Sequence, residues 1–218
     1  MANLILGSAS PRRRDLLQAL GIAFEIDVAH VDEDQITLSN PGQNVLARAQ
    51  LKAQALRDRY LGENLILTAD TTVALGHQIL NKPQGREDAI RMLKSLRGQT
   101  HQVYTGMILI DLSGTVYERL SQSDVKMRPY TDREIEAYVG SGDPMDKAGA
   151  YAIQHAGFHP VEEIDQCFAG IMGLGVCQLL ELFSLVELGS MPNLSHFTKK
   201  VGEGLCPYCI SRFNRLLD

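Results

Sequence analysis

Short continuous apolar runs and helix-spaced apolar positions alternate along this chain, a pattern that predicts intermixed strands and helices. The run at 4–6 predicts a buried strand. Ser10 and Pro11 follow where a helix would begin, because serine caps helix N-termini and proline fits the first helical position. Leucines at helical spacing then continue to Gly21, which ends the helix. The chain is therefore expected to open as a strand, a tight loop and a helix.

The rest of the pattern predicts further elements of both kinds. A helix is expected from Asn40-Pro41 to Gly62, and a buried strand over 65–70 that continues into a hairpin around Gly76. The other predicted elements are a helix over 88–96, long strands over 102–112 and 115–127, a helix with a Thr131/Glu134 capping box that ends at Gly140, and an apolar helix over 171–188. Helices and strands intermix, so the fold class is α/β or α+β with a mixed sheet.

Composition and charge narrow the class of protein. The chain has 218 residues, 44% of them hydrophobic, which suffices for a real core. A net charge of −5 argues against a nucleic-acid partner, which requires a basic face. The sequence contains no apolar run long enough to span a membrane and no secretory signal pattern. Four cysteines in a chain of this length do not form a disulfide framework, so a cytoplasmic location is expected.

The densest positive charge, at 12–14, lies in the first turn of the first predicted helix. Basic residues there oppose the helix dipole at a cost of about 0.3–1 kcal/mol, so the arrangement calls for a reason. A helix N-terminus attracts anions, and Gly7 and Ala9 would let a ligand approach the backbone closely. The alternative is a surface helix that happens to begin with arginines. The motif lacks the Gly-Lys-Ser/Thr ending of a P-loop. The expected phosphate contacts are Ser8, Ser10, Arg12 and Arg13.

Asp70 ends an apolar strand, where active-site carboxylates of open sheets often lie, although it could equally cap a turn. A lysine near Asp70 would favour the active-site role, and whether Lys82 lies near it depends on the register of the hairpin. A three-residue loop would place Lys82 opposite Thr72, on the face of Asp70. A two-residue loop would place it on the face of Thr71. The sequence leaves both registers open.

Other charged residues have an ordinary interpretation beside a chemical one. Lys52 borders the apolar stripe of its helix, where a lysine usually extends along the surface. Glu33 lies in an acidic loop that could simply be solvated. Alternatively, the carboxylates could hold a hard divalent cation through oxygen ligands. The candidate metal cluster is Asp32, Glu33, Asp34 and Asp70.

Six ordered segments resemble the motifs of the Maf family of nucleoside triphosphate pyrophosphatases, related in fold to the inosine triphosphatase group. They are "SASPRRRDLL", "VDE", the lysine of "ARAQLKAQAL", "ADTTVALGHQILNKP", "HQVYTG" and "DKAGAYAIQ". The resemblance covers roughly 3–189. It implies an elongated α/β fold whose mixed sheet is flanked by helices, with a cleft between two lobes. It also implies a nucleoside triphosphate substrate, a divalent metal such as Mg²⁺ or Mn²⁺, and commonly a homodimer.

The resemblance also implies roles for individual residues. Asp70 would be the proton acceptor that activates water, and Glu33 would help with metal or water. Ser8, Arg13, Lys52 and Lys82 would hold the phosphates. Arg12, Thr71 and Gln154 match the pattern of the branch that resembles dTTP/UTP pyrophosphatases. The branch that acts on 7-methyl-GTP, the alternative, typically has Trp in place of Arg12.

Two parts of the chain depart from the family pattern. The stretch 166–176 has Gly170 and Gly175 where the family usually has Asn and Pro. This departure motivates a second hypothesis, a catalytically weakened nucleotide-binding regulator of cell division. Residues 190–218 form an extension in which Cys206 and Cys209 could pack by chance, bind metal with His196 or form a redox-sensitive disulfide. A third hypothesis is therefore an interaction protein that works through this tail.

Overall fold

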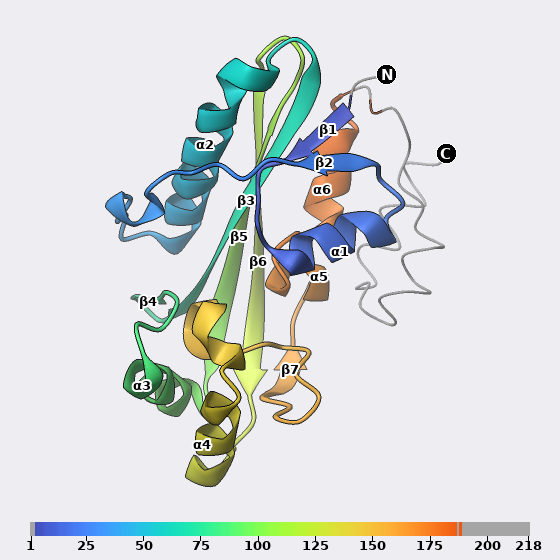
Figure 1. Cartoon of the computed structure of the whole chain (residues 1–218). Helices are drawn as coiled ribbons and strands as arrows, with labels where there is room; N and C mark the ends of the chain where they lie inside the picture. The colour runs from blue at the N-terminus through green and yellow to red at the C-terminus, as the bar shows by residue number, and fades with distance from the viewer. Residues whose placement is uncertain (1–2, 187, 189–218) are drawn as a thin grey trace.

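The computed structural model describes residues 3–186 and Leu188, and it is built on one long mixed sheet (Figure 1). The strand order is β2-β1-β3-β5-β6-β7, with β4 paired to β3. Its three longest strands run the length of the molecule, and the central one, β5 (Thr100–Ile110), is antiparallel to both β3 (Asn64–Leu75) and β6 (Val116–Met127). The shorter strands are β1 (Asn3–Leu6), β2 (Phe24–Ile26), β4 (Gln78–Leu80) and β7 (Val161–Ile164).

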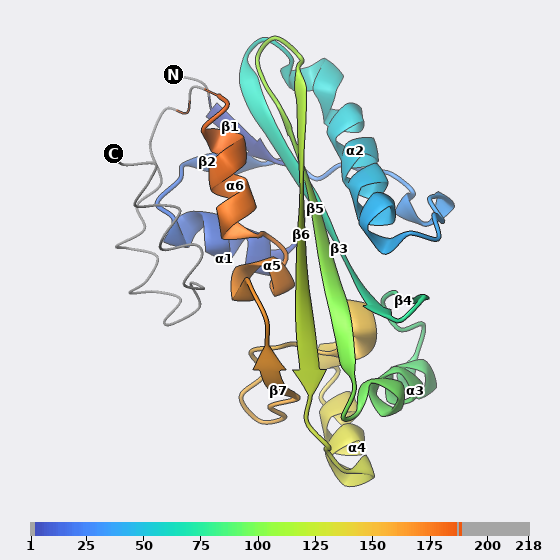
Figure 2. The same cartoon turned by 180° about the vertical axis from the view of Figure 1, so that it is seen from behind.

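In the upper lobe, helices cover both faces of this sheet. Helices α1 (Pro11–Ala19) and α6 (Val176–Phe183) pack on one face around the buried side chains of β1 and of the first half of β3. Helix α2 (Pro41–Tyr60) packs on the opposite face, where Ala49, Ala53 and Leu56 meet Ile66 of β3. Figure 2 shows the same two layers from behind.

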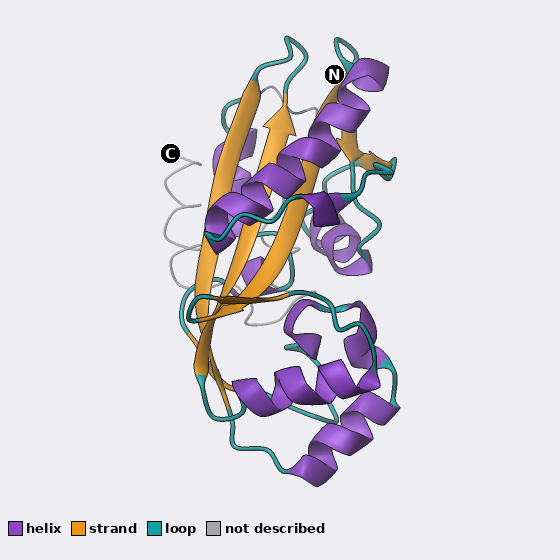
Figure 3. Cartoon of the chain, turned by 90° about the vertical axis from the view of Figure 1, so that its left-hand side faces the viewer, coloured by secondary structure: helices purple, strands orange, loops and turns teal. Residues whose placement is uncertain are grey.

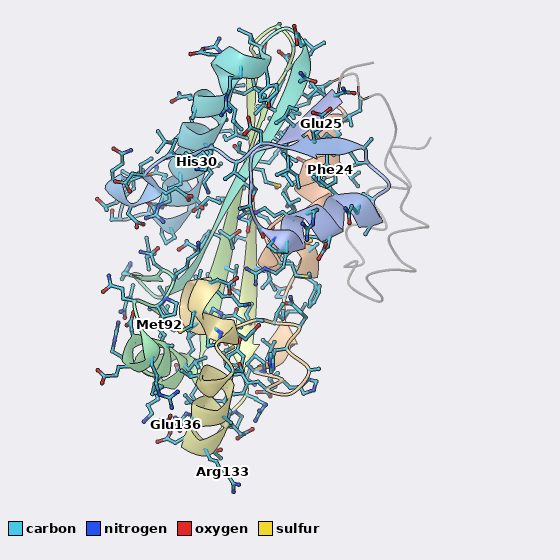
Figure 4. The ribbon with its side chains drawn as sticks, in the orientation of Figure 1. Phe24, Glu25, His30, Met92, Arg133 and Glu136 are labelled. Carbon is cyan, nitrogen blue, oxygen red and sulfur yellow. The ribbon has the colours of Figure 1, made fainter. Side chains whose placement is uncertain are left out.

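The lower lobe has its own core. Helices α3 (Arg86–Leu96) and α4 (Asp132–Gly140) pack there with the far ends of β3, β5 and β6. The side chain of Met92 on α3 is buried in this core, whereas Arg133 and Glu136 lie on α4 at the outer end of the lobe (Figure 4). In the side view the helices of the two lobes are separated, and the long strands run between them (Figure 3). Short helical turns η1 (Glu33–Gln35), η2 (Asp143–Asp146), η3 (Ala148–Ala150) and α5 (Phe168–Ile171) complete the described chain.

One edge of β3 is open between the lobes. β1 pairs with residues 64–67 of β3, and β4 pairs with residues 73–75 on the same side. Within the described residues, 68–72 therefore have a strand neighbour only on the β5 side. Since both helical layers end near this opening, side chains from either face of the sheet can reach one shared space.

Most predicted elements are confirmed, including the opening strand–loop–helix, the α/β class and the two-lobed sheet. The Thr131/Glu134 capping box is present, because Thr131 accepts from the Glu134 backbone and Glu134 accepts from the Thr131 backbone. The hairpin has the two-residue loop, since Leu75 pairs with Gln78. The single helix over 171–188 is wrong. Gly173 adopts a φ of 114°, which a helix does not allow, so the helix is interrupted between α5 and α6.

No helix in the described part of the chain is long and apolar enough to cross a membrane. The expectations for His196, Cys206 and Cys209 concern residues outside the described part of the chain. The whole of the expected extension 190–218 also lies outside it.

Candidate active site

A cavity of about 1020 Å³ lies beside the open edge of β3, with walls from both lobes. Its upper wall comes from the loop before α1, from η1 and from α2, and its lower wall from residues 143–154. The described residues that sequence reasoning placed in the site all line this cavity: Ser8, Ser10, Arg12, Arg13, Glu33, Lys52, Asp70, Thr71, Lys82 and Gln154. The structure therefore brings together residues that are up to 146 positions apart, from Ser8 to Gln154.

Arg13 is a buried guanidinium held on three sides. Its Nη1 donates to Ser8 Oγ at 2.9 Å, its Nη2 to Thr71 Oγ1 at 3.0 Å, and its Nε to the Gly173 carbonyl at 3.0 Å. Burial lowers the pKa of Arg13 below its ordinary value, and nearby Asp70 opposes that effect. An arginine stays protonated in proteins nonetheless, so the site contains a fixed positive charge with N–H groups left for an anion.

Lys52 lies between two carboxylates on the other side of the cavity. Its Nζ is 2.8 Å from Asp70 Oδ1 and 2.6 Å from Glu33 Oε2, and it also donates to the Ala69 carbonyl at 3.2 Å. Lys52 and Asp70 are both buried, and Glu33 is half-buried. Burial raises the pKa of Glu33, and the neighbouring Asp70 raises it further, while Lys52 opposes both effects. The ammonium is thus the group that keeps two adjacent carboxylates together.

The predicted four-carboxylate metal cluster is wrong. Asp32 accepts from the backbone N–H of Asp34 in η1, and Asp34 is exposed beside Arg48. Among the described residues, no three His, Cys, Asp or Glu side chains are grouped to hold a metal ion. The remaining pair, Glu33 and Asp70, does fit Mg²⁺ or Mn²⁺, because Mg²⁺ usually takes one or two carboxylates together with substrate phosphates and waters.

The other predicted cations divide into two groups. Arg12 and Lys82 line the cavity and, within the described chain, neither has a carboxylate within ion-pair distance. Arg14, the third of the consecutive arginines, does not line the cavity. It is exposed beside Asp15, since consecutive helical residues point in different directions.

Two residues of the opening loop, Ser10 and Gly7, have local contacts that the sequence did not predict. Ser10 is the N-cap residue of α1, but its side chain makes no capping hydrogen bond, and its backbone N–H donates to Ser8 Oγ at 3.3 Å. Gly7 lines the cavity, and packing also favours a glycine there, because a Cβ would lie 2.6 Å from side-chain carbons of Leu56 and Thr68. The glycine thus lets the first loop lie directly on α2 and β3.

Sequence reasoning missed several charged and polar residues of the cavity. Arg48 lines it one turn before Lys52, and this spacing of four is a signal that could have identified it. Lys147 lines the lower wall, with its Nζ 3.1 Å from Asp143 Oδ1 and 2.6 Å from Asp146 Oδ1. Tyr151 also lines the lower wall. Both Lys147 and Tyr151 stand in the quoted "DKAGAYAIQ" segment.

The altered stretch 166–176 does not change the cavity wall at its two unusual glycines. The cavity is lined by Ile171, Met172 and Gly173 of this stretch. A Cβ at Gly170 would lie 2.4 Å from Ser121 Oγ, and a Cβ at Gly175 would lie 2.8 Å from both Ser121 Cβ and Oγ. These glycines therefore make room for a serine of β6.

His155, which directly follows the last motif, has a local structural role. His155 Nδ1 accepts from the Phe158 backbone N–H at 2.9 Å, and its ring makes an edge contact with Tyr138. A local cap of this kind explains His155 without any metal.

Comparison with known proteins agrees with this site. Residues 3–186 match the family described as Maf-like protein. The chain belongs to that family. A dTTP/UTP pyrophosphatase of Gloeobacter violaceus is 44% identical over 182 residues, which is 83% of this chain and 94% of the relative. A dTTP/UTP pyrophosphatase of Dehalococcoides mccartyi is 37% identical over 96% of this chain and 92% of its own length.

Another Maf-family relative, a dTTP/UTP pyrophosphatase of Shigella boydii, is 41% identical over 84% of this chain and 93% of its own length. Among solved structures, a HAM1 protein from Coxiella burnetii aligns with 60% of this chain and 75% of its own chain. That alignment has 12% identity and a TM-score of 0.39, too small a likeness to support an argument about fold or activity.

Proposed function

We propose that this Maf-family protein hydrolyses a pyrimidine nucleoside triphosphate, dTTP or UTP, to the monophosphate and pyrophosphate. One observation carries the proposal: a single cavity combines cations that no described carboxylate neutralises with a buried carboxylate held by a lysine. The cations are Arg12, Arg13 and Lys82, and the lysine and carboxylate are Lys52 and Asp70. A polyphosphate supplies the negative charge that this arrangement lacks, and Asp70 supplies a base.

Each side chain has a part in hydrolysis at the α-phosphorus. Asp70 accepts from Lys52 through Oδ1, which leaves Oδ2 to take a proton from the attacking water. Negative charge builds on the non-bridging phosphate oxygens as water attacks, and Arg13 and Lys82 stabilise it because they are already in place. Ser8 orients Arg13 through the hydrogen bond to Nη1.

Glu33 and Asp70 would hold the divalent metal, Mg²⁺ or Mn²⁺, together with phosphate oxygens. When bound, such an ion neutralises phosphate charge and lowers the pKa of a bound water. Lys52 lies between the same two carboxylates, and its positive charge holds them adjacent before the substrate arrives.

The lower wall suits the nucleoside end of the substrate. Tyr151 and Ile153 give it apolar surface, and Gln154 adds an amide that can both donate to and accept from a pyrimidine. Arg12, Thr71 and Gln154 are the residues proposed to set the preference for dTTP and UTP. The relatives named above carry that substrate pair in their names. A cytoplasmic location and a homodimer stay predictions.

The test is pyrophosphate release from a panel of nucleoside triphosphates with Mg²⁺ or Mn²⁺, beside an Asp70→Asn variant of the full chain. Release from dTTP and UTP that falls by about 10²–10⁴-fold in the variant is expected. Nucleotide binding without release from any member of the panel would contradict the proposal and favour a non-catalytic nucleotide-binding regulator. Preferential release from 7-methyl-GTP would contradict the substrate assignment alone.

A further inference from the structure

Thr105 lies behind the cavity wall and ends a chain of hydrogen bonds that begins at Arg13. Its Oγ1 is 2.9 Å from Thr71 Oγ1 and 2.8 Å from the Gly170 carbonyl. Thr105 is 1% exposed and is not among the described residues that line the cavity. It can therefore affect a ligand only through a neighbour.

The donor and the acceptor of each hydrogen bond between Arg13 and Gly170 follow from the groups involved. A hydroxyl has one proton, and the Thr105 proton goes to the Gly170 carbonyl, which can only accept. Thr105 must then accept from Thr71, and Thr71 in turn accepts from Nη2 of Arg13 at 3.0 Å. Each group therefore donates to the next one along the line from Arg13 to the Gly170 carbonyl. The guanidinium charge polarises all three of these hydrogen bonds.

The same direction limits what Thr71 can do in the cavity. Its one proton is given to Thr105, so its hydroxyl has only lone pairs to present, and one of them already accepts from Arg13. Thr71 therefore cannot donate to a phosphate oxygen or a base carbonyl while this chain is intact. It affects the substrate through the guanidinium it holds.

Arg13 is thereby anchored twice to the stretch 166–176. Its Nε donates directly to the Gly173 carbonyl, and its Nη2 reaches the Gly170 carbonyl through two threonines. Nη1 donates to Ser8 Oγ, so each guanidinium nitrogen has one fixed partner. Two N–H groups, one on each Nη, are left for an anion in a fixed orientation.

We propose that Thr105 is a positioning residue for phosphate binding, which sets the orientation of the Arg13 guanidinium through the hydroxyl of Thr71. The inference rests on the proposed function, since it takes Arg13 as a ligand of the substrate's phosphates. It deepens that function by assigning Thr71 to the phosphate end of the cavity rather than to direct contact with the base.

The experiment compares Thr105→Val with Thr105→Ser in the full chain. Valine keeps the shape and removes the hydroxyl, whereas serine keeps the hydroxyl and removes the methyl. Binding of inorganic tripolyphosphate is measured by calorimetry, and KM and kcat are measured for release of pyrophosphate from dTTP.

We expect the valine variant to bind tripolyphosphate about tenfold more weakly, because it loses roughly one hydrogen bond. KM rises by a similar factor with kcat little changed, because the contact is present before and during the reaction. The serine variant should bind within about twofold of the parent protein, since the hydroxyl chain remains.

Thr68→Val is the matched control, because Thr68 is a buried threonine of the same sheet that donates to a backbone carbonyl, Ala49, at 2.7 Å. Within the described part of the chain Thr68 makes no hydrogen bond with Arg13 and does not line the cavity, so the Thr68→Val variant should lose thermal stability without a change in tripolyphosphate affinity. If Thr105→Val does not fold, Thr71→Val breaks the same chain one link closer to Arg13. Where both single variants fold, the double variant Thr71→Val/Thr105→Val should bind no more weakly than Thr71→Val alone.

Two outcomes would overturn the inference: unchanged tripolyphosphate affinity in the valine variants, or a serine variant as impaired as the valine one. Failure of the proposed function is separately visible. In that case the parent protein releases no pyrophosphate from any nucleotide, while tripolyphosphate binding still decides the role of Thr105.

Discussion

Asp70 and Thr71 are consecutive residues of β3 whose side chains lie on opposite faces of the sheet, yet both line one cavity. Asp70 accepts from Lys52 of α2 on one face, and Thr71 accepts from Arg13 of α1 on the other. Successive side chains of a strand always alternate in this way. In a sheet paired on both sides the two would be separated by the sheet itself. Here β3 lacks a neighbour at 68–72 within the described chain, so the two faces meet at its edge.

This geometry separates two tasks. On the proposed function, the carboxylates and the lysine that handle water and metal lie on the α2 face, and the arginine that binds phosphate lies on the α1 face. Because adjacent residues of one rigid strand hold both sets, their relative position does not depend on a flexible loop.

Replacing Lys52 by methionine should impair turnover far more than an ordinary surface substitution. The variant keeps the length of the side chain but leaves the Glu33 and Asp70 carboxylates facing each other without a cation. Each then raises the pKa of the other, and a positive charge is lost from the site. We expect kcat/KM for pyrophosphate release to fall by about 10²–10³-fold. Lys126→Met, at an exposed ion pair with Glu162, is the control and should retain full activity. Equal activities of the two variants would contradict the assigned role of Lys52.

Glu33→Gln should change the pH profile of the reaction. Burial and Asp70 raise the pKa of Glu33, so the carboxylate takes up a proton at a higher pH than an ordinary glutamate does. Activity that needs both carboxylates ionised should therefore decline on acidification already above about pH 4.5. In the glutamine variant kcat/KM should be lower at neutral pH, and its decline should begin at a lower pH. Glu136→Gln, at an exposed position on α4, should leave the profile unchanged. An unchanged acid limb in Glu33→Gln would assign that limb to another group.

The glycines of the altered stretch should differ in how they respond to a change at Ser121. Gly170→Ala brings its Cβ against Ser121 Oγ, and Gly175→Ala brings its Cβ against Ser121 Cβ as well. Each overpacked variant should lose about 1–3 kcal/mol in the free energy of unfolding, measured by denaturant titration. Ser121→Ala removes only the hydroxyl, so it should restore stability to Gly170→Ala and leave Gly175→Ala destabilised. Rescue of both variants, or of neither, would show that these contacts do not decide the packing.

Much of the site could be predicted because its chemistry is local in sequence. The arginines beside Pro11, the carboxylate that ends an apolar run and the lysine on a helix stripe each carry a recognisable pattern. The resemblance to known motifs added Gln154, which patterns alone leave as an ordinary polar residue. All of these residues except Arg14 line the cavity.

The remaining features depend on distant contacts that no local pattern reveals. Thr105 is an ordinary strand threonine until Thr71 and Gly170 are placed beside it, 34 and 65 residues away in sequence. The helix predicted over 171–188 is interrupted at Gly173, whose carbonyl accepts a hydrogen bond from Arg13, 160 residues away in sequence. The hairpin register at Gly76 is set by backbone pairing of β4, for which the sequence allows two loop lengths.

His101 should make the folded protein lose stability on mild acidification. It is fully buried on β5, its Nε2 lies 2.7 Å from the hydroxyl of Tyr151, and burial lowers its pKa from 6.5 to about 4. Between these two values the unfolded chain binds a proton that the folded chain does not. The free energy of unfolding therefore falls as the pH drops from 6.5 toward 4, and His101 contributes nothing to this dependence above that range. The full effect is about 3 kcal/mol.

Denaturant titrations at several pH values, compared with His101→Gln, should isolate this contribution. Glutamine has no titratable group, so the variant should lose the part of the pH dependence that lies between pH 6.5 and 4, although carboxylates still contribute to the remainder. His77→Gln, in the exposed loop after β3, is the control and should follow the parent curve. If His101→Gln also follows that curve, the folded protein protonates His101 as readily as the unfolded chain does, and burial does not depress its pKa.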